Sequence, residues 1–497
     1  MVILLIAALV IPAVTGTALL VSGRVSTPQS EANANTISLY ASVLTAALVI
    51  ATVITRPVLN QSWLPSLGVR LHFAVDGISA PLLLLTAALS VAVVVHAQSR
   101  PSHGGSPASF YGCLQLVELG ALATFYARDA IIFYVAFEIV LVPMWVLIAR
   151  YGDSHDLAAR RDASGRFVLY TVLGSTLMLI GILALVQASG TADLDALAAA
   201  HGAGMARSTQ IIIAALLLVG MGIKVPVWPL HTWLPPAHTI APTAGSVMLA
   251  AVLLKMGTYG IVRLAIAPLP LGFGALAPAF AVVGVIGIVW GGLACLVEND
   301  LKRLIAYSSV AHMGFVVLGL SSGTTVGLQA ALFANIAHGV VSALLFFLVG
   351  GLKERWGSAD LATARAALRE ISPRLGIALV VGFAASLGLP GLIGFWGEFL
   401  AMYSAWNPSP DRPQGLMRFL VVVAVLGAGV AAAYSLRVLK LIWSGERTTP
   451  AHQDASGAEW SVLAVLMSAV LVLGVAPGLL LHSTIKDAAA ITMELPR

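Results

Sequence analysis

The sequence GMGIKVPVWPLHTWLPPAH, residues 220–238, combines membrane-like hydrophobicity with several prolines. Proline removes a backbone donor and interrupts the hydrogen bonds of a helix. A second segment of this kind is FAASLGLPGLIGFWGEF at residues 383–399. Irregular backbone at membrane depth is tolerated only inside protein or beside water. The two segments therefore predict a pair of broken helices, a layout typical of inverted-repeat transporters. The residues predicted to break them are Pro226, Pro229, Pro390 and Gly391.

The composition favours a membrane protein. Of 497 residues, 59% are hydrophobic and 10% are charged, and the mean hydropathy is +0.94. Soluble domains carry about 25% charged residues, so the composition excludes a soluble enzyme, a disordered chain and a nucleic-acid-binding protein. The excess of 27 Lys+Arg over 22 Asp+Glu is too thin for a phosphate-binding surface. Cys113 and Cys295 lie in apolar runs and fit neither a disulfide framework nor a metal site.

Apolar runs long enough to cross a bilayer recur along the whole chain. A bilayer core of about 30 Å requires roughly 20 residues per helix, and about fourteen runs meet this length. The N-terminal run lacks a basic region and exceeds a signal-peptide core in length, so we expect it to be retained. The predicted fold is an all-α polytopic membrane protein with helices at 2–22, 36–55, 73–98, 107–127, 129–149, 167–188, 209–229, 239–262, 275–297, 303–321, 326–352, 373–402, 416–441 and 459–481.

The loop charges predict the orientation. Lys and Arg are more numerous in the loops after odd-numbered helices than in the other loops and the termini. The positive-inside rule places the former loops in the cytoplasm, and an even helix count then places both termini outside. The Ala/Val/Gly-rich composition favours a bacterial plasma membrane.

Ionisable residues far from the predicted helix ends indicate function. A charge at the bilayer centre costs about 2.5–3.5 kcal/mol on insertion scales, so such residues are rare and usually functional. The alternative for each is a packed, hydrogen-bonded core group or a lysine that reaches the interface. The predicted proton-relay residues are Glu138, Lys224, Lys255, His312, His338 and Glu398. A second set, considered as further relay residues, is Glu118, His231 and His238.

These residue types predict transport chemistry. An opposite charge nearby keeps a buried Glu or Lys ionised, and separation of the pair favours proton release from the lysine. A pair formed by Glu138 and Lys224 would act in this way. The sequence contains no nucleophile elbow, phosphate loop, cysteine cluster or His–carboxylate metal spacing.

Four stretches resemble the antiporter-like membrane subunits of respiratory complex I, and among these the M type, equivalent to chain 4. They are FYVAFEIVLVPMWVLI, KVPVWPLHTWLPPAHTIAPTAGSVMLAAVLLKMGTYGIVR, LKRLIAYSSVAHMGFV and GLPGLIGFWGEF. The similarity extends from about Phe133 to Phe399. It implies two inverted five-helix repeats within fourteen helices. The corresponding divisions are helices 1–3 at 1–106, a first repeat at 107–263, a second at 264–442, and a loop with helix 14 at 443–497.

The resemblance also implies roles for single residues. Glu138 and Lys224 match the family's ion pair, and Lys255 matches its central lysine. Glu398 matches the acid near the exit side. The L-type, N-type and Mrp subunits generally carry Lys there, so Glu398 favours the M type. The connecting relay groups match His312 and His338.

The expected function is therefore proton translocation as a subunit of NADH:quinone oxidoreductase. No cofactor is expected in this chain, since NADH, FMN, iron–sulfur clusters and quinone would bind partner subunits. Membrane neighbours of L and N type are implied, with lipid around them and no nucleic acid. The alternatives are an Mrp-type cation/proton antiporter subunit, a membrane hydrogenase subunit, a haem cytochrome and a non-conducting scaffold. A cytochrome would need more stacked histidine pairs than His312 and His338 provide.

Overall fold

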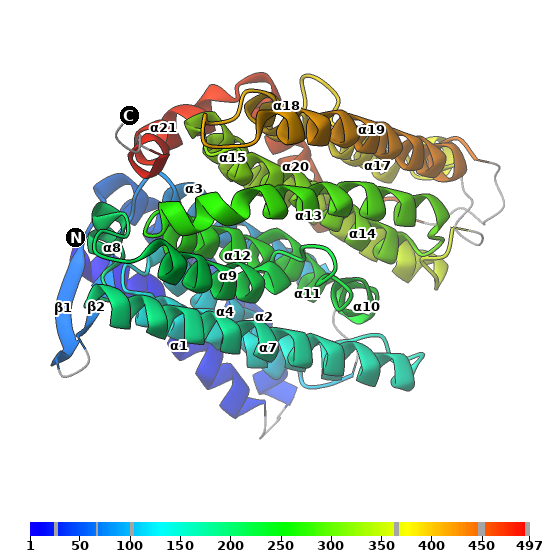
Figure 1. Ribbon diagram of the computed structural model, residues 1–497. Helices are drawn as coiled ribbons and strands as arrows, with labels where there is room; N and C mark the ends of the chain where they lie inside the picture. The colour runs from blue at the N-terminus through cyan, green and yellow to red at the C-terminus, as the bar shows by residue number, and fades with distance from the viewer. Residues whose placement is uncertain (24–27, 66–67, 100–103, 362–366, 446–452, 493–497) are drawn as a thin grey trace. The chain divides into compact units, whose positions relative to one another are not determined.

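The computed structural model describes residues 1–23, 28–65, 68–99, 104–361, 367–445 and 453–492. Helices dominate these residues, and one two-stranded antiparallel hairpin accompanies them (Figure 1). The chain divides into two compact units, each described by itself below. The first unit comprises Met1–Val225, Ile240–Leu276 and Lys486–Arg497, and the second comprises Pro226–Thr239 and Ala277–Ile485.

The first unit contains the hairpin and the helices that precede the first break. Its elements are α1 (Val2–Ser22), α2 (Pro28–Thr55), β1 (Leu59–Leu64), β2 (Val69–Phe73), α3 (Ser79–Ser99), α4 (Pro107–Tyr126), α5 (Ala130–Ile139), α6 (Leu141–Tyr151), α7 (Leu157–Ser189), α8 (Leu194–Ala200) and α9 (Arg207–Lys224). One further membrane-length run follows the break. It consists of α11 (Thr243–Met248), the π-helix η2 (Leu249–Leu253), α12 (Leu254–Gly260) and the π-helix η3 (Ile261–Ile266).

The second unit holds most of the remaining helices. Its elements are α10 (Leu234–Ile240), α13 (Pro270–Val297), α14 (Leu301–Ser321), α15 (Thr325–Trp356), α16 (Leu368–Ile371), α17 (Pro373–Ser386), α18 (Ile393–Trp406), α19 (Gln414–Val438), the π-helix η4 (Leu439–Trp443), α20 (Gly457–Val475) and α21 (Gly478–Thr492). Helices α13 and α21 each extend across the division between the units.

The predicted polytopic helical fold is confirmed. Among the described residues, 13 helices are long and apolar enough to cross a membrane. Each corresponds to one predicted run, and the predicted run at 373–402 is the broken pair α17 and α18. The predicted seventh helix ends earlier than expected, at Lys224, because Pro226 supplies no backbone donor. The predicted sixth helix begins earlier, at Leu157, because Asp156 caps it by accepting the N–H of Ala159 at 2.9 Å.

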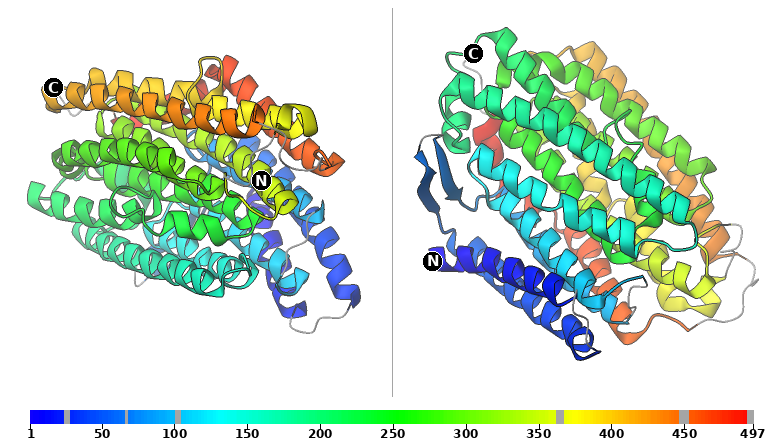
Figure 2. Two further views of the ribbon diagram at one scale, coloured as in Figure 1. Left: turned by 90° about the vertical axis from the view of Figure 1, so that its right-hand side faces the viewer. Right: turned by 90° about the horizontal axis from the view of Figure 1, so that it is seen from below.

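Small residues bring helices of the first unit close together. Helix α7 packs along α9, and α1 packs against α2 and α4 (Figures 1 and 2). A Cβ at Gly220 would lie 2.6 Å from the carbonyl oxygen of Gly174, so only glycine fits at this α7–α9 contact. Such contacts are typical of membrane helices, which associate through close backbone approach rather than through a hydrophobic driving force. Apolar side chains on the opposite face of α7, such as Leu169 and Leu183, are exposed, as expected of a surface that contacts lipid.

Helix α15 lies at the centre of the second unit. It packs against α14, α17, α18 and α20, and all of its apolar window is buried. The run from Thr243 to Ile266 is 94% buried, the highest share within a span that belongs to the first unit. Lys255 and His338 therefore lie on the two most enclosed spans.

The second helix break is an unwound stretch between Ser386 and Ile393. Gly388 and Gly391 adopt φ values of +74° and +90° there. L-residues with a side chain avoid this region, so glycine permits the chain to leave and re-enter a helix within one turn. A Cβ at Gly388 would lie 3.0 Å from Oε2 of Glu398. The break is thus built directly against a predicted relay residue.

Candidate functional site

Lys224 is the last residue of α9. Its side chain is buried, with 2% of the residue exposed, and Nζ lies 5.3 Å from the ring centroid of Phe137 and 5.6 Å from that of Phe167. A cation at a helix C-terminus is favoured by the helix dipole, and a cation above an aromatic ring is favoured by the ring quadrupole. No hydrogen-bond partner of Nζ is found among the described residues. The charge is therefore held by weak, reversible interactions.

Glu138 lies beside a helix irregularity that the hydrophobic pattern did not reveal. Helix α5 ends at Ile139 and α6 begins at Leu141, because Pro143 cannot donate a hydrogen bond to the carbonyl of Ile139. The Glu138 carboxylate interacts with the charge of Lys224 and with the hydroxyl of Ser175. The structure thus brings the two residues of the predicted pair into electrostatic reach of each other.

Lys255 is completely buried at the start of α12. Its Nζ donates a hydrogen bond of 2.8 Å to the carbonyl oxygen of Ala250 in the π-helix η2. A π-turn widens the helix and is frequent at functional sites. Here the widened turn supplies a carbonyl oxygen to the side-chain nitrogen of Lys255.

His312 is held between two side chains in the second unit. Its Nδ1 lies 2.8 Å from Oε1 of Glu398, and its Nε2 lies 3.0 Å from the hydroxyl of Ser386. Ser386 ends α17 and Glu398 lies in α18, so the imidazole connects the two halves of the broken helix. Such a ring can accept a proton on one nitrogen and release one from the other.

A small cavity adjoins this group. It offers about 30 Å³ of space for water and is lined by His312, His338, Glu398 and Ser386, together with Ser308, Ser309 and Ser342. One water needs about 10–15 Å³ of such space, so the cavity has room for about two. The ring centroids of His312 and His338 are 5.8 Å apart, a separation that a water molecule can bridge. The structure therefore brings three predicted relay residues to one hydratable space.

The second set of predicted residues is also buried. His231 is 3% exposed, and His238 is fully buried with its ring stacked on Phe346 at 4.6 Å. Glu118 is fully buried in α4 and accepts a hydrogen bond of 3.3 Å from Ser42. These positions leave the relay role of all three as a prediction.

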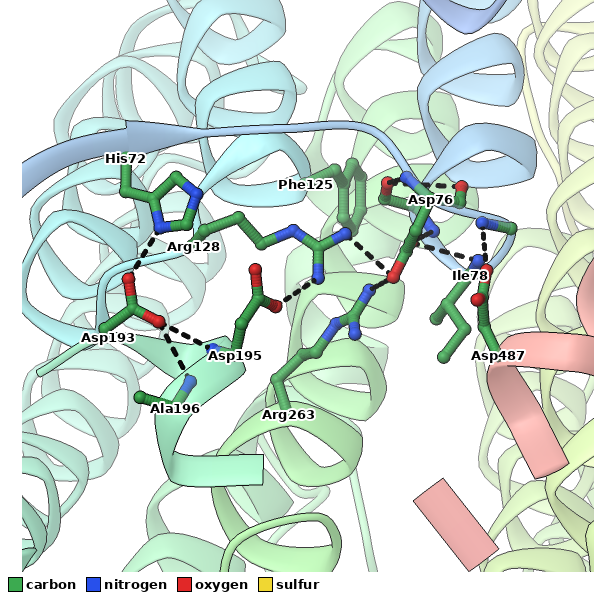
Figure 3. A network of polar contacts seen from close by, with 12 residues as sticks. His72, Asp76, Ile78, Phe125, Arg128, Asp193, Asp195, Ala196, Arg263 and Asp487 are labelled. Carbon is green, nitrogen blue, oxygen red and sulfur yellow. Dashed lines mark hydrogen bonds and ion pairs between the residues drawn. The ribbon is translucent and has the colours of Figure 1, made fainter. Parts of the chain in front are cut away.

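A charged network that the sequence analysis missed lies at one end of the first unit (Figure 3). Arg128 donates from Nη2 to Oδ2 of Asp76 at 2.7 Å, and Arg263 bonds to the same oxygen. The two arginines hold the pKa of Asp76 well below its usual range, although burial alone would raise it. Nη1 of Arg128 lies 3.2 Å from Oδ1 of Asp195. One carboxylate oxygen thus binds two guanidinium groups.

The network joins loops and helix ends that are far apart in the sequence. Its residues come from the loops or helix ends after the second, fourth, sixth and eighth predicted helices. Asp487, which follows the fourteenth predicted helix in the sequence, accepts the N–H of Gly77 at 2.5 Å. Loops after even-numbered helices must lie on one side, so this clustering agrees with the predicted helix order. A usable signal was present in the sequence, because Arg128 and Arg263 stand at the very ends of apolar runs.

His72, Asp193 and Asp195 form the group best placed to bind a cation in the described part of the chain, with ligand atoms within 4.8 Å of one another. His72 Nδ1 already lies 2.7 Å from Asp193 Oδ2. The guanidinium of Arg128 is bonded to Asp195 and opposes a second positive charge there. The arrangement is therefore better suited to ion pairing than to metal binding.

Comparison with a family model places this geometry in context. Residues 127–427 match the family described as NADH:quinone oxidoreductase/Mrp antiporter, TM. The matched range contains every predicted relay residue from Glu138 to Glu398.

Relatives and solved structures match over most of the chain. NAD(P)H-quinone oxidoreductase chain 4 3 of Trichormus variabilis is 34% identical over 87% of this chain and 81% of its own length. NADH-quinone oxidoreductase subunit M of Rhodobacter capsulatus is 31% identical over 94% of this chain and 92% of its own. A chain of respiratory complex I from Thermus thermophilus superposes with a TM-score of 0.87 at 30% identity, covering 99% of this chain and 100% of that one. A chain of the Mrp complex from Dietzia shares the fold, with a TM-score of 0.85 at 22% identity, covering 99% of this chain and 98% of its own.

Proposed function

Because the chain belongs to the NADH:quinone oxidoreductase/Mrp antiporter family of membrane proteins, we propose that it carries protons across the membrane as a subunit of NADH:quinone oxidoreductase. The resemblance inferred from its motifs is confirmed by relatives named chain 4 and subunit M. The proposed relay consists of Glu138, Lys224, Lys255, His312, His338 and Glu398.

The observation that carries this proposal is the cavity beside the second helix break. Two histidines and a carboxylate surround a space of about 30 Å³, enough for water, inside the most enclosed part of the second unit. Packing alone does not require such a group, because apolar side chains would fill the space at lower desolvation cost. Titratable groups around water are what a proton path needs.

The first unit contributes a switchable charge. When Glu138 and Lys224 approach each other, both stay ionised, and when they separate, burial favours release of the lysine proton. The absence of a hydrogen-bond partner for Lys224 Nζ among the described residues makes such a separation inexpensive. In this proposal Lys255 takes part in proton transfer within the first unit, and His312, His338 and Glu398 take part in it within the second unit.

The driving energy would come from the rest of the complex. Moving one charge against the membrane potential costs about 2.3 kcal/mol per 100 mV, so the charge states must be gated to prevent leakage.

We propose that this chain binds no redox cofactor, and that NADH, FMN, iron–sulfur clusters and quinone bind partner subunits. Its neighbours would be antiporter-like subunits of L and N type in a bacterial plasma membrane. Both termini would face outward.

Replacement of the proposed pair tests the function. Glu138→Gln and Lys224→Ala should each largely abolish NADH-driven acidification of inverted membrane vesicles, because each removes one charge of the switch. Assembly of the complex, followed by native gel, should persist. Asp162→Asn is a matched control, since it removes an exposed carboxylate paired with Arg166. Normal pumping in both relay variants would refute the proposal.

The Mrp-type alternative predicts a different requirement. An antiporter subunit exchanges protons for cations, so transport would depend on external Na⁺ and would need no NADH. Vesicles in which proton uptake requires NADH and is independent of Na⁺ would exclude it. The presence of Glu398, where Mrp subunits generally carry Lys, argues against this alternative.

A further inference from the structure

A second contact holds the helix that carries Glu398. The indole Nε1 of Trp396, two residues before Glu398 in α18, donates a hydrogen bond of 2.7 Å to the carbonyl oxygen of Gly474. Gly474 is the last residue but one of α20, where the carbonyl oxygens have no partner within the helix. A tryptophan N–H in a packed site requires an acceptor. The bond therefore satisfies one polar group on each helix.

The backbone of the second helix break packs against the same glycine. A Cβ at Gly474 would lie 2.4 Å from the carbonyl oxygen of Gly391 and 2.5 Å from Cα of Leu392, so only glycine fits there. Small residues permit this close approach between membrane helices. Helix α20 therefore contacts both the unwound stretch and the first turn of α18, in which Trp396 lies.

Three successive residues of α18 meet three different helices. Trp396 bonds to α20, and Glu398 bonds to His312 in α14. Between them, a Cβ at Gly397 would lie 2.7 Å from Cβ of Ala334 in α15. Each residue advances about 100° around a helix, so the side chains of Trp396 and Glu398 point about 200° apart. A rotation of α18 by about 20° would move a group ~5 Å from its axis by about 2 Å. Such a shift would break the 2.8 Å contact between the Glu398 carboxylate and the His312 imidazole.

The other end of α20 is fixed by charged groups. Glu459 is fully buried in its first turn and bonds to the guanidinium of Arg355 in α15 at 2.7 and 2.9 Å. Asp454, just before α20, accepts the N–H groups of Arg374 and Leu375 at 3.0 and 3.2 Å. These two residues begin α17, and α20 also packs against α17 (Figure 1). Helix α20 is thus attached to the start of α17 and to the break that follows it.

We infer that α20 braces the second helix break, and that Trp396 and Gly474 are positioning residues for the pair formed by Glu398 and His312. The brace fixes the rotation of α18, and this rotation decides whether the carboxylate meets the imidazole. Helix α20 lies beyond residues 127–427, so the family match does not include this contact. The inference rests on the proposed role of Glu398 in proton transfer.

Trp396→Phe tests the hydrogen bond, because phenylalanine keeps an aromatic ring but lacks the N–H. One neutral hydrogen bond changes an equilibrium about two- to tenfold. NADH-driven pumping by the whole complex in liposomes should therefore fall about threefold. Trp406→Phe is the matched control, since Trp406 ends the same helix and is 44% exposed. A fall of less than twofold in Trp396→Phe, or an equal fall in Trp406→Phe, would overturn the inference.

Gly474→Ala tests the backbone contact. The added methyl group would meet the backbone of the break, so pumping should fall at least as much as in Trp396→Phe. Gly457→Ala is its control, because Gly457 begins α20 and a Cβ there has nothing within 4 Å. Equal pumping in the two alanine variants would overturn the inference. If a native gel shows that Gly474→Ala does not assemble, Trp396→Phe decides the question.

Combining Trp396→Phe with Glu398→Gln separates positioning from a merely structural role. If Trp396 acts through the carboxylate, the double variant should pump as fast as Glu398→Gln alone, because the effects of coupled residues do not add. A further fall equal to that of Trp396→Phe alone would show a separate structural role and overturn the inference. Normal pumping in Glu398→Gln would refute the role of Glu398 in the proposed function. Slow pumping there, with normal pumping in Trp396→Phe, would refute the brace alone.

Discussion

Replacing Glu398 with glutamine tests the relay where the hydrogen bonds are best defined. Glu398 Oε1 lies 2.8 Å from Nδ1 of His312, and the side chains are 12% and 16% exposed. Glutamine keeps the size and an acceptor oxygen but removes the charge. A hydrogen bond to a charged group contributes about 1.5–3 kcal/mol, and each 1.36 kcal/mol is tenfold in rate. Proton transfer at this point should therefore slow about tenfold or more.

The assay compares two rates in the same liposomes. NADH-driven formation of a pH gradient should fall in Glu398→Gln, and electron transfer to quinone in the presence of an uncoupler should fall much less. Ser386→Ala is a graded control, because it removes only the neutral hydrogen bond to Nε2 of His312. Such a bond contributes about 0.5–1.5 kcal/mol, so pumping should slow by roughly tenfold at most. Unaltered pumping in Glu398→Gln, or a larger effect in Ser386→Ala, would refute the role of the pair.

Three further predictions test particular contacts. Asp76→Asn should lower the thermal stability of the complex by the same amount at every pH from 8 to 5. The arginines depress the pKa of Asp76 in the folded state. The stabilisation by Asp76 is therefore complete above its unfolded-state pKa of about 3.9 and declines only below that value. A deficit that changes within that pH window would contradict this account. Glu459→Gln should destabilise the second unit by about 3–5 kcal/mol, because it leaves the buried guanidinium of Arg355 without its counter-charge. In the unaltered protein this guanidinium is bonded to the Glu459 carboxylate at 2.7 and 2.9 Å. The measurement is thermal unfolding, in which the double variant Glu459→Gln/Arg355→Met should be more stable than Glu459→Gln alone. Gly388→Ala and Gly391→Ala should each cost about 1–2 kcal/mol of stability through their positive φ values, but only Gly388→Ala should also reduce pumping, since its Cβ would contact the relay carboxylate. Equal pumping in the two alanine variants would show that the contact is unimportant.

Most of the helical architecture could be predicted from the sequence because the signal is local. An apolar run of bilayer length forms a spanning helix wherever it lies, and the breaks at Pro226 and Pro390 follow from lost backbone donors. Helix ends were less predictable. The polar start of α7 belongs to the helix because Asp156 caps it, and a hydropathy pattern does not register a cap.

The candidate site was partly predictable for a related reason. A charge in an apolar run is costly, so Lys224, Lys255 and Glu398 could be identified one by one. Their partners could not. Serine is a common residue in such helices, so the sequence does not single out Ser386 or Ser175. Only packing shows that Ser386 bonds to His312 and that Ser175 interacts with Glu138.

The sequence by itself determined the class of the molecule, its spanning segments, its two helix breaks and the family motifs. These depend on solvation cost and backbone chemistry, which act on neighbouring residues of the chain. Only the tertiary structure decided that Asp76 joins Arg128 and Arg263, which lie 135 residues apart in the sequence, and that His312 lies between Ser386 and Glu398. Such contacts depend on how separate helices pack, and packing joins residues that no local pattern connects.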